Sequence, residues 1–432
     1  MTPVSDRQAE RRLNNPLRKL GPGVITGAAD DDPSGIATYS QGGAQFGFHL
    51  LWTMVLTFPL MVAVQMISAR IGRVTGRGLA HNMCQVMPRG AVAGLVALLF
   101  VANTINIGAD LAAMGAAAEL MLGTNSPWVG HGFTLGFALL SLGLQILIPY
   151  RRYARFLMVL TFSLFAYVAV LFLLELDWRA IGAGLVGISD GLSPAAATVI
   201  VAVFGTTISP YLFFWQSAQE VEEIDHDPAQ HPLTRADGRE ARQALADIRT
   251  DTLAGMFISN AIALAIMIAT AATLHQNGIT QIETASQAAA ALRPIAGDFA
   301  FALFALGIIG TGLLAVPVLA GSVAYAVGEM QGWRIGLDNT AGQARGFYGV
   351  IAAAVLLGIG LDFSPLDPFE ALYWSAVLNG LIAVPMMAAM MWVARGRAMG
   401  AHRPGTLLAG LGWLATAVMA AAAGAMIWFT LA

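Results

Sequence analysis

Three consecutive aspartates, Asp30, Asp31 and Asp32, lie inside the first apolar stretch of the chain and directly precede Pro33. A carboxylate at membrane depth costs at least about 2.5 to 3.5 kcal/mol, so three together require a cation, water or a cavity. Pro33 lacks an N–H, and its ring clashes with the carbonyl four residues back, which interrupts a helix. We therefore expect an unwound stretch that binds a cation, with Asp32 as its main ligand. The alternative is that the acids are solvated at the mouth of the segment.

A second break is expected at Pro210. Thr206 and Ser209 lie three residues apart, so a helical turn places them on the same face. Their hydroxyl oxygens, with the carbonyls that Pro210 frees, suit a hard cation such as Mg²⁺ or Mn²⁺. The other interpretation is a proline kink in which Ser and Thr merely bond to the backbone. The coincidence of two breaks favours ion binding.

Further polar residues recur in later apolar segments. Asn103, Asn106 and Asp110 follow helical spacing and form one polar stripe, in which Asp110 is predicted to be functional. Asn379 is a single polar residue that could equally join two helices. The lone cysteine, Cys84, cannot form an intramolecular disulfide and is expected to be a small apolar side chain.

The elements that carry these residues are predicted to be membrane-spanning helices. Of 432 residues, 57% are hydrophobic and only 11% are charged, against about 25% charged in soluble domains. Lipid must therefore cover much of the surface, and a net charge of −3 without a basic domain gives no indication of nucleic-acid binding. At about 20 residues a span, we expect about eleven segments: 20–45, 47–70, 90–121, 130–149, 153–176, 194–219, 248–274, 297–329, 345–361, 368–394 and 406–430.

Orientation follows from the distribution of basic residues. With eleven spans and a cytoplasmic N-terminus, all but Arg179 and Arg293 of the 23 Lys and Arg residues fall on the cytoplasmic side. Residues 1–19 are polar and basic and predict a cytoplasmic segment without a cleavable signal peptide. We therefore expect a multi-pass protein of the cytoplasmic (inner) membrane.

The spacing of the two breaks predicts how the single transmembrane domain, residues 20–430, is organised. The breaks fall in the first and sixth segments, and an offset of five places the second in an inverted copy of the first. Matching broken helices in inverted halves point to a transporter's midplane site. We expect repeat one over about 20–176, repeat two over about 194–394 and an extra helix over about 406–430. Residues 220–249 and 331–344 predict aqueous loops, and 282–293 a short amphipathic helix.

The motifs resemble those of NRAMP divalent-metal transporters. The run 21–35 is similar to that family's first helix, which ends in Asp-Pro-Gly-Asn, and 44–52 to its continuation into the second. The run 109–112 resembles the third-helix motif Thr-Asp-Leu-Ala-Glu, and 205–211 resembles the Met-Pro-His break of the sixth helix. The resemblance implies an all-α, LeuT-type fold in which helices one to five and six to ten are inverted repeats.

Several family positions carry other residues here. The metal-binding Asn falls on Gly35, the metal-binding Met on Ser209 and the sixth-helix His on Tyr211, while two third-helix Glu fall on Asn103 and Ala113. Without the thioether the bias against Mg²⁺ is removed, and Gly35 leaves room for the ion's waters. Losing the His and two Glu removes titratable groups. The pattern resembles the NRAMP-related magnesium and manganese transporters.

The sequence therefore predicts a monomeric transporter of Mn²⁺, Mg²⁺ or both, working by alternating access with weak or no proton coupling, and neither an enzyme nor dependent on a cofactor. Its partners are the transported ion and the lipid bilayer. The candidate metal ligands are Asp32, Gly35, Thr206, Ser209, Asp31 and Ala29. The candidate pathway residues are Asp30, Asp110, Asn103, Tyr211 and Asn379.

Four alternatives remain open at this stage. One is a proton-coupled Mn²⁺/Fe²⁺ importer of the same family. Another is an amino-acid transporter of the same architecture, against which the acids argue because they would repel an α-carboxylate. A third is an intramembrane aspartyl hydrolase in which Asp32 and Asp110 share a proton, although no protease motif flanks them. The last is a non-transporting metal sensor.

Overall fold

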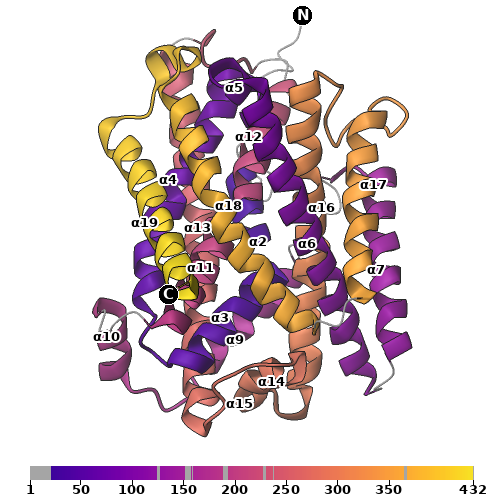
Figure 1. Cartoon of the computed structure of the whole chain (residues 1–432), viewed down its shortest axis with the longest axis vertical. Helices are drawn as coiled ribbons and strands as arrows, with labels where there is room; N and C mark the ends of the chain where they lie inside the picture. The colour runs from indigo at the N-terminus through magenta and orange to yellow at the C-terminus, as the bar shows by residue number, and fades with distance from the viewer. Residues whose placement is uncertain are drawn as a thin grey trace, which may run out of the picture.

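A computed structural model describes the chain over residues 21–123, 127–150, 157, 159–187, 193–226, 230–236, 238–363 and 367–431. The regular elements in these ranges are all helices (Figure 1). Nine of the described helices are long and apolar enough to cross a membrane, which agrees with the high hydrophobic fraction. The predicted cytoplasmic segment 1–19 lies outside the described residues.

The two remaining predicted spans are a broken helix and a short one. The first consists of α2 (Pro22–Asp30) and α3 (Pro33–Phe46). Within the predicted segment 153–176, the described apolar helix covers Val159–Leu171 and includes α9 (Phe165–Leu171). The all-α fold with about eleven spans is therefore confirmed, whereas the boundaries of the two repeats stay a prediction.

The other helices follow in an order close to the predicted one. Their bounds are α4 (Trp52–Thr75), α5 (Leu79–Val86), α6 (Arg89–Leu122), α7 (Pro127–Leu147), α10 (Trp178–Val186), α11 (Pro194–Thr207), α12 (Pro210–His226), α13 (Gly238–Thr273), α14 (Ala285–Ala289), α15 (Arg293–Ala296), α16 (Ala300–Gln331), α17 (Arg345–Ile359), α18 (Pro368–Arg395) and α19 (Thr406–Leu431). The short helices α14 and α15 lie together at one end of the bundle and α5 lies at the other (Figure 1).

One predicted loop is wrong for most of its length. Within 220–249, α12 continues to His226 and α13 begins at Gly238, so only the described residues 230–236 between them lack helix. Residues 238–249 contain three Ala and three Arg together with Glu240, Gln243 and Leu245, residue types that favour helix in water as well as in a protein. The charge of this stretch therefore indicates that it is solvated, but it does not indicate an irregular backbone.

Both predicted breaks are present. The first helical path is interrupted at Asp31 (φ −82°, ψ 50°), between α2 and α3. The second is interrupted at Ile208 (φ −119°, ψ 54°), between α11 and α12. Each second half begins with a proline, Pro33 or Pro210, where the missing N–H costs nothing because the first N–H groups of a helix have no partner within it.

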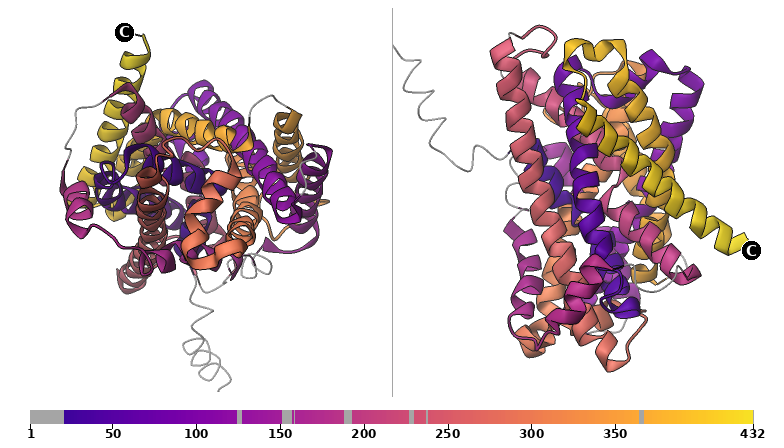
Figure 2. Two further views of the ribbon diagram at one scale, coloured as in Figure 1. Left: turned by 90° about the horizontal axis from the view of Figure 1, so that it is seen from below. Right: turned by 90° about the vertical axis from the view of Figure 1, so that its left-hand side faces the viewer.

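Glycines let the broken helices approach their neighbours closely. A Cβ at Gly27 of α2 would lie 2.5 Å from the backbone of Gly255 in α13. A Cβ at Gly205 of α11 would lie 2.1 Å from the carbonyl oxygen of Ala376 in α18. Figure 2 shows the bundle from below and from the side, and the break residues Asp31 and Ile208 are buried within it. The breaks are therefore held in the core by backbone-to-backbone contact.

Candidate metal-ion site

Asp32 is the residue on which the candidate site is built. It is the N-cap of α3, and its Oδ1 accepts hydrogen bonds from the Gly35 N–H (2.8 Å) and the Ser34 hydroxyl (2.6 Å). Its Oδ2 accepts from Asn106 Nδ2 and from the Tyr211 hydroxyl, each at 3.3 Å. The side chain is 1% exposed. One carboxylate oxygen is thus committed to capping, while the other meets α6 and α12.

Thr206, Ser209 and Gly35 contribute differently at the second break. The Thr206 hydroxyl is buried and has no hydrogen-bond partner in the described chain. It faces Gly35, where a Cβ would lie 3.2 Å from Thr206 Oγ1. The Ser209 hydroxyl lies 2.7 Å from the carbonyls of both Gly205 and Thr206. Ser209 therefore bonds to the freed backbone, as the proline-kink interpretation expected, and its oxygen can still accept. Of these two hydroxyls, that of Thr206 is the one without a hydrogen-bond partner among the described residues.

Tyr211 joins the two breaks. Its hydroxyl lies 3.2 Å from the Ala29 carbonyl oxygen and 3.3 Å from Asp32 Oδ2. The Ala29 carbonyl is therefore directed to the same region as the Asp32 carboxylate, from the end of α2. Five of the predicted site residues, Asp32, Gly35, Ala29, Thr206 and Tyr211, are brought together by these contacts.

Asp30 and Asp31 are directed elsewhere. The hydroxyl of Ser259 in α13 donates to Asp30 Oδ2 at 2.7 Å and lies 3.0 Å from Asp31 Oδ1. Both side chains are buried, at 0% and 4% exposed, so they are not solvated at a helix mouth. Asp30 Oδ1 has no hydrogen-bond partner among the described residues. Two of the three tandem acids thus form a second polar cluster against α13.

Asn106 is a central contact that the set of predicted site residues missed. Its Nδ2 donates to Asp32 Oδ2 (3.3 Å) and to Asp110 Oδ2 (3.1 Å). Its Oδ1 accepts from Ser375 Oγ (3.2 Å) and Asn379 Nδ2 (3.0 Å), both in α18. The amide therefore stands between the two carboxylates and links them to α18. Helical spacing indicated that Asn106 lies one turn before Asp110, on the same face of the helix. It gave no reason to choose Asn106 as a site residue over Asn103.

Asn103 does not belong to this group of contacts. Its Nδ2 donates to the Leu319 carbonyl and to Ser322 Oγ, both at 2.9 Å in α16. It therefore joins α6 to α16 on another face of the helix. Asn379, by contrast, reaches the site through Asn106. Ser375 was also missed, although it lies one turn before Asn379 and could have been found by helical spacing.

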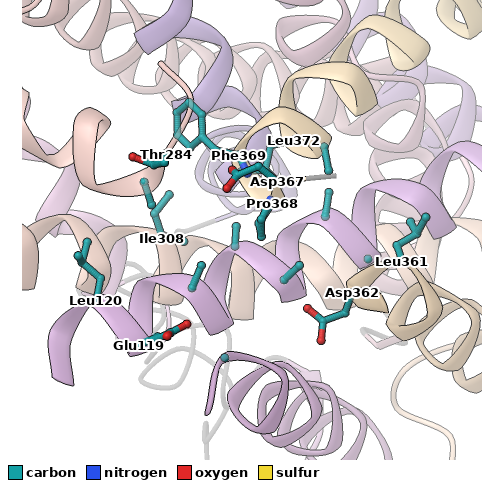
Figure 3. A pocket seen from close by; sticks show the side chains of 18 of the residues that line it. Glu119, Leu120, Thr284, Ile308, Leu361, Asp362, Asp367, Pro368, Phe369 and Leu372 are labelled. Carbon is teal, nitrogen blue, oxygen red and sulfur yellow. The ribbon is translucent and has the colours of Figure 1, made fainter. Parts of the chain in front are cut away.

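A cavity of about 550 Å³ leads toward the site from the α14 and α15 end of the bundle. Its walls come from α6, α7, α16 and α18, and they include Ala109, beside Asp110, and Leu372, one turn before Ser375. Figure 3 shows the carboxylates of Glu119, Asp362 and Asp367 at separate points around it. The cavity thus combines small apolar side chains with acids along its wall.

Two of these acids have defined local surroundings. Asp362 Oδ2 lies 2.7 Å from His131 Nδ1, and its Oδ1 accepts from Thr134 Oγ1 at 3.2 Å. Asp367 caps α18 by accepting from the Phe369 N–H at 2.8 Å. Partial burial raises the pKa of Asp367, with smaller contributions from the neighbouring carboxylates of Glu370 and Glu283. The cavity wall therefore carries three carboxyl groups, of which Asp367 is the one whose ionisation burial opposes.

The oxygen atoms around Asp32 suit a hard divalent cation. Among the described residues, no group of three or more His, Cys, Asp or Glu side chains could hold a metal ion. A cation beside Asp32 would meet one carboxylate and neutral oxygens, a set that hard cations such as Mg²⁺ and Mn²⁺ accept. Hydrolysis by an aspartyl pair is not supported, because the amide of Asn106 stands between Asp32 and Asp110.

Comparison with known proteins decides the family. Residues 23–429 match the family model "Natural resistance-associated macrophage protein-like", Nramp. The chain belongs to the NRAMP family. A divalent metal cation transporter MntH of Deinococcus radiodurans is 28% identical over 427 residues, which cover 97% of this chain and 91% of that relative. An MntH of Yersinia pestis is 31% identical over 324 residues, 71% of this chain and 73% of the relative.

Solved structures of low sequence identity share the fold. A manganese transporter of Eremococcus coleocola (mutant H236A) superposes with a TM-score of 0.71 at 17% identity, covering 98% of this chain and 87% of that one. Mhp1, a nucleobase-cation-symport-1 family transporter, gives a TM-score of 0.56 at 13% identity, covering 95% and 92%. The resemblance to NRAMP proteins and the predicted LeuT-type fold are therefore both confirmed.

Proposed function

We propose that this NRAMP protein carries divalent metal ions across the cytoplasmic membrane by alternating access around Asp32, as a monomer. The observation that supports this most strongly is the buried Asp32 carboxylate, which lies where both helix breaks meet. Its Oδ2 accepts from Tyr211 and Asn106, and the same Tyr211 hydroxyl lies 3.2 Å from the Ala29 carbonyl oxygen. A carboxylate buried at such a point stays ionised only with strong compensation, and a divalent cation supplies it. The relatives named above are described as divalent metal cation transporters.

Mn²⁺ and Mg²⁺ are the ions that we propose for the site. Asp32, Thr206, Ser209 and the Ala29 carbonyl offer oxygen atoms only, and soft thioether ligation is not available at Ser209. Mg²⁺ retains several waters when bound, and Gly35 leaves the space between α3 and Thr206 without a side chain. We assign Asp31 a supporting electrostatic role, because its carboxylate is directed to Ser259.

Weak or absent proton coupling is part of the proposal. Tyr211, Ala113 and Asn103 occupy the positions where the family's His and two Glu are expected, so Asp110 is the one acid left in the third-helix stripe. A proton-coupled Mn²⁺/Fe²⁺ importer is the rival within the family. Acidification of a liposome lumen in step with Mn²⁺ uptake would favour that rival, whereas uptake without a pH change supports the proposal.

The direction of the cavity follows from the proposed orientation. With the basic residues on the cytoplasmic side, the α14 and α15 end faces outward, so the acid-lined cavity would receive ions from outside. Negative walls raise the local concentration of cations. The three tandem acids argue against an amino-acid substrate, whose carboxylate they would repel.

Ion flux in proteoliposomes tests the assignment of Asp32. Asp32→Asn keeps a helix-capping side chain but removes the charge, and we expect Mn²⁺ uptake to fall to background. Asp177→Asn is the matched control, because Asp177 is also an N-cap aspartate, of α10, but lies exposed at the surface. Uptake by Asp32→Asn equal to that of the control would contradict the assignment.

A further inference from the structure

An apolar groove on the outside of the bundle shares no lining residue with the candidate ion site. It has a volume of about 520 Å³ and is lined by α4, α13 and the start of α19. Pro59 and Met66 come from α4, Leu253 from α13, and Leu407 and Leu411 from α19. Because these are membrane-spanning helices and Leu407 is 77% exposed, the groove opens toward lipid.

Two guanidinium groups line the same groove. Arg70 of α4 is partly buried and donates from Nη1 to the Arg403 carbonyl at 3.3 Å, and Arg249 of α13 is exposed. Within the described ranges neither guanidinium forms an ion pair with a carboxylate. Asp251, the acid two residues after Arg249, accepts instead from the Gly23 N–H at the start of α2. Among the described residues, the positive charge of the groove therefore has no paired carboxylate.

The charged part of the groove lies near one end of α4, and the apolar part extends from it along the helix. Arg70 and Pro59 are eleven residues apart on α4, which corresponds to about 16 Å at 1.5 Å per residue. Arg70 lies near the end of α4 that ends at Thr75, at the level of the membrane surface, and Pro59 lies deeper. A ligand that complements this groove has an anionic head and an apolar tail about as long as the trough.

We propose that the groove binds an anionic glycerophospholipid, with its phosphate between Arg70 and Arg249 and one acyl chain lying along α4 between α13 and α19. Two guanidinium groups from different helices, neither of them paired with an acid in the part of the chain that the structure describes, distinguish this groove from a surface that any lipid tail would cover. The bound lipid would connect α4, α13 and α19. Since α13 also carries Ser259, which contacts Asp30 and Asp31, the lipid would hold the helix against which the first break packs.

Binding of phosphatidylglycerol to the purified full chain in detergent tests the proposal without any measurement of transport. Native mass spectrometry and thermal unfolding are compared with phosphatidylglycerol and with phosphatidylcholine. We expect phosphatidylglycerol to bind at least about tenfold more tightly and to raise the unfolding temperature, because each basic residue near an anionic headgroup contributes a few-fold in affinity.

A pair of double variants separates the groove from general charge effects. R70Q/R249Q should lose at least about tenfold in phosphatidylglycerol affinity. R334Q/R345Q removes the same charge from exposed positions near α17 and should bind as the wild type does. R249Q alone, at an exposed position, should lose a few-fold and keeps the test valid if the double variant does not fold.

Three outcomes would overturn the proposal. The first is equal affinity for the two lipids, and the second is an equal loss in both double variants. The third is stabilisation by soluble glycerol phosphate as large as that by phosphatidylglycerol, which would show that an anion suffices and that the apolar trough is not used.

Discussion

At the scale of single residues, the two oxygens of Asp32 have different tasks. Oδ1 is held by the Ser34 hydroxyl and the Gly35 N–H, so the carboxylate cannot rotate without uncapping α3. Oδ2 is held by two longer bonds from Tyr211 and Asn106, which an incoming cation can replace or share. The local cap thus fixes the direction in which the ligand oxygen points, before any ion arrives.

Asn106 is expected to position this oxygen. In Asn106→Leu, Asp32 and Asp110 lose a donor and Ser375 and Asn379 lose an acceptor. A hydrogen bond to a charged group contributes about 1.5 to 3 kcal/mol, so we expect the KM for Mn²⁺ uptake to rise at least about tenfold.

The control is Asn103→Leu, in the same helix and equally buried. Its amide makes two hydrogen bonds, to Leu319 and Ser322, against four for Asn106, so Asn103→Leu should also lower the free energy of unfolding, by about 1 to 3 kcal/mol. Only Asn106→Leu should change the KM. An equal change of KM in both variants would mean that Asn106 acts only through general packing.

At the scale of elements, the half-helix α2 is placed by its contact with α13. Glycines at 27 and 255 bring the two backbones together, and Asp251 of α13 accepts from the Gly23 N–H at the α2 N-terminus. This contact determines which way the acids at the end of α2 face. It also explains why the carboxylates of Asp30 and Asp31 contact Ser259 of α13 and do not lie beside the Asp32 carboxylate.

Gly27→Ala should therefore lower both the stability of the protein and its transport rate. The new Cβ would lie 2.5 Å from the backbone of Gly255, and overpacking of this kind costs about 1 to 3 kcal/mol. We expect a lower unfolding temperature and slower Mn²⁺ uptake, measured on the purified protein and in liposomes.

Gly410→Ala in α19 gives the opposite expectation. Nothing lies within 4 Å of a Cβ there, so the change should be neutral or stabilising by up to about 1 kcal/mol, since Ala favours helix over Gly. If Gly27→Ala proved as stable as Gly410→Ala, the backbone contact between α2 and α13 would not hold in solution.

At the scale of the whole molecule, the acid-lined cavity extends from one end of the bundle to Ala109, the neighbour of Asp110 in α6. Its acids are Glu119 of α6 and, more than 240 residues later in the sequence, Asp362 of the 3₁₀ segment Gly360–Phe363 and Asp367 at the start of α18. Their negative charge in a shared cavity attracts cations and also opposes folding when the carboxylates ionise.

Asp367 gives a pH-dependent test of this electrostatic cost. Because its pKa in the folded chain is raised by burial and by Glu370 and Glu283, the protonated form is favoured by folding. That stability is present below the unfolded pKa of about 3.9 and is lost as the pH rises through the folded pKa. Asp367→Asn, whose amide oxygen can still cap α18, should unfold at a higher temperature than the wild type at pH 7, and the difference should vanish as the pH falls below about 4.

Asp177→Asn, at the exposed N-cap of α10, is again the control variant, here for Asp367→Asn. Asp177→Asn changes the same group at a helix start outside the cavity, and it should not be more stable than the wild type at pH 7. A stabilisation of equal size in both variants would assign the effect to helix capping instead of to the charge of the cavity.

The sequence predicts where the two helices break, but it does not predict which side chains of distant helices meet at the breaks. Pro33 and Pro210 mark both breaks because proline disfavours a continuous helix, and the polar residues beside them distinguish these positions from Pro59, Pro317 and Pro385, which lie inside the continuous helices α4, α16 and α18. Asp32 follows as the acid at the first break. The partners of Asn106 could not be predicted, because Ser375 and Asn379 lie more than 260 residues away and meet it only through packing of α6 on α18. The direction in which the side chains of Asp30 and Asp31 point could not be predicted either, because it depends on how α2 is rotated against α13.

The location of a bound ion tests the assignment of Asp32 most directly. Crystals of the full chain soaked in Mn²⁺ would reveal the ion by its anomalous scattering. We expect one principal peak about 2.0 to 2.6 Å from Asp32 Oδ2, the range of oxygen ligands to hard divalent cations, and no such peak in Asp32→Asn crystals. A principal peak between Asp30, Asp31 and Ser259, with none at Asp32, would contradict the assignment.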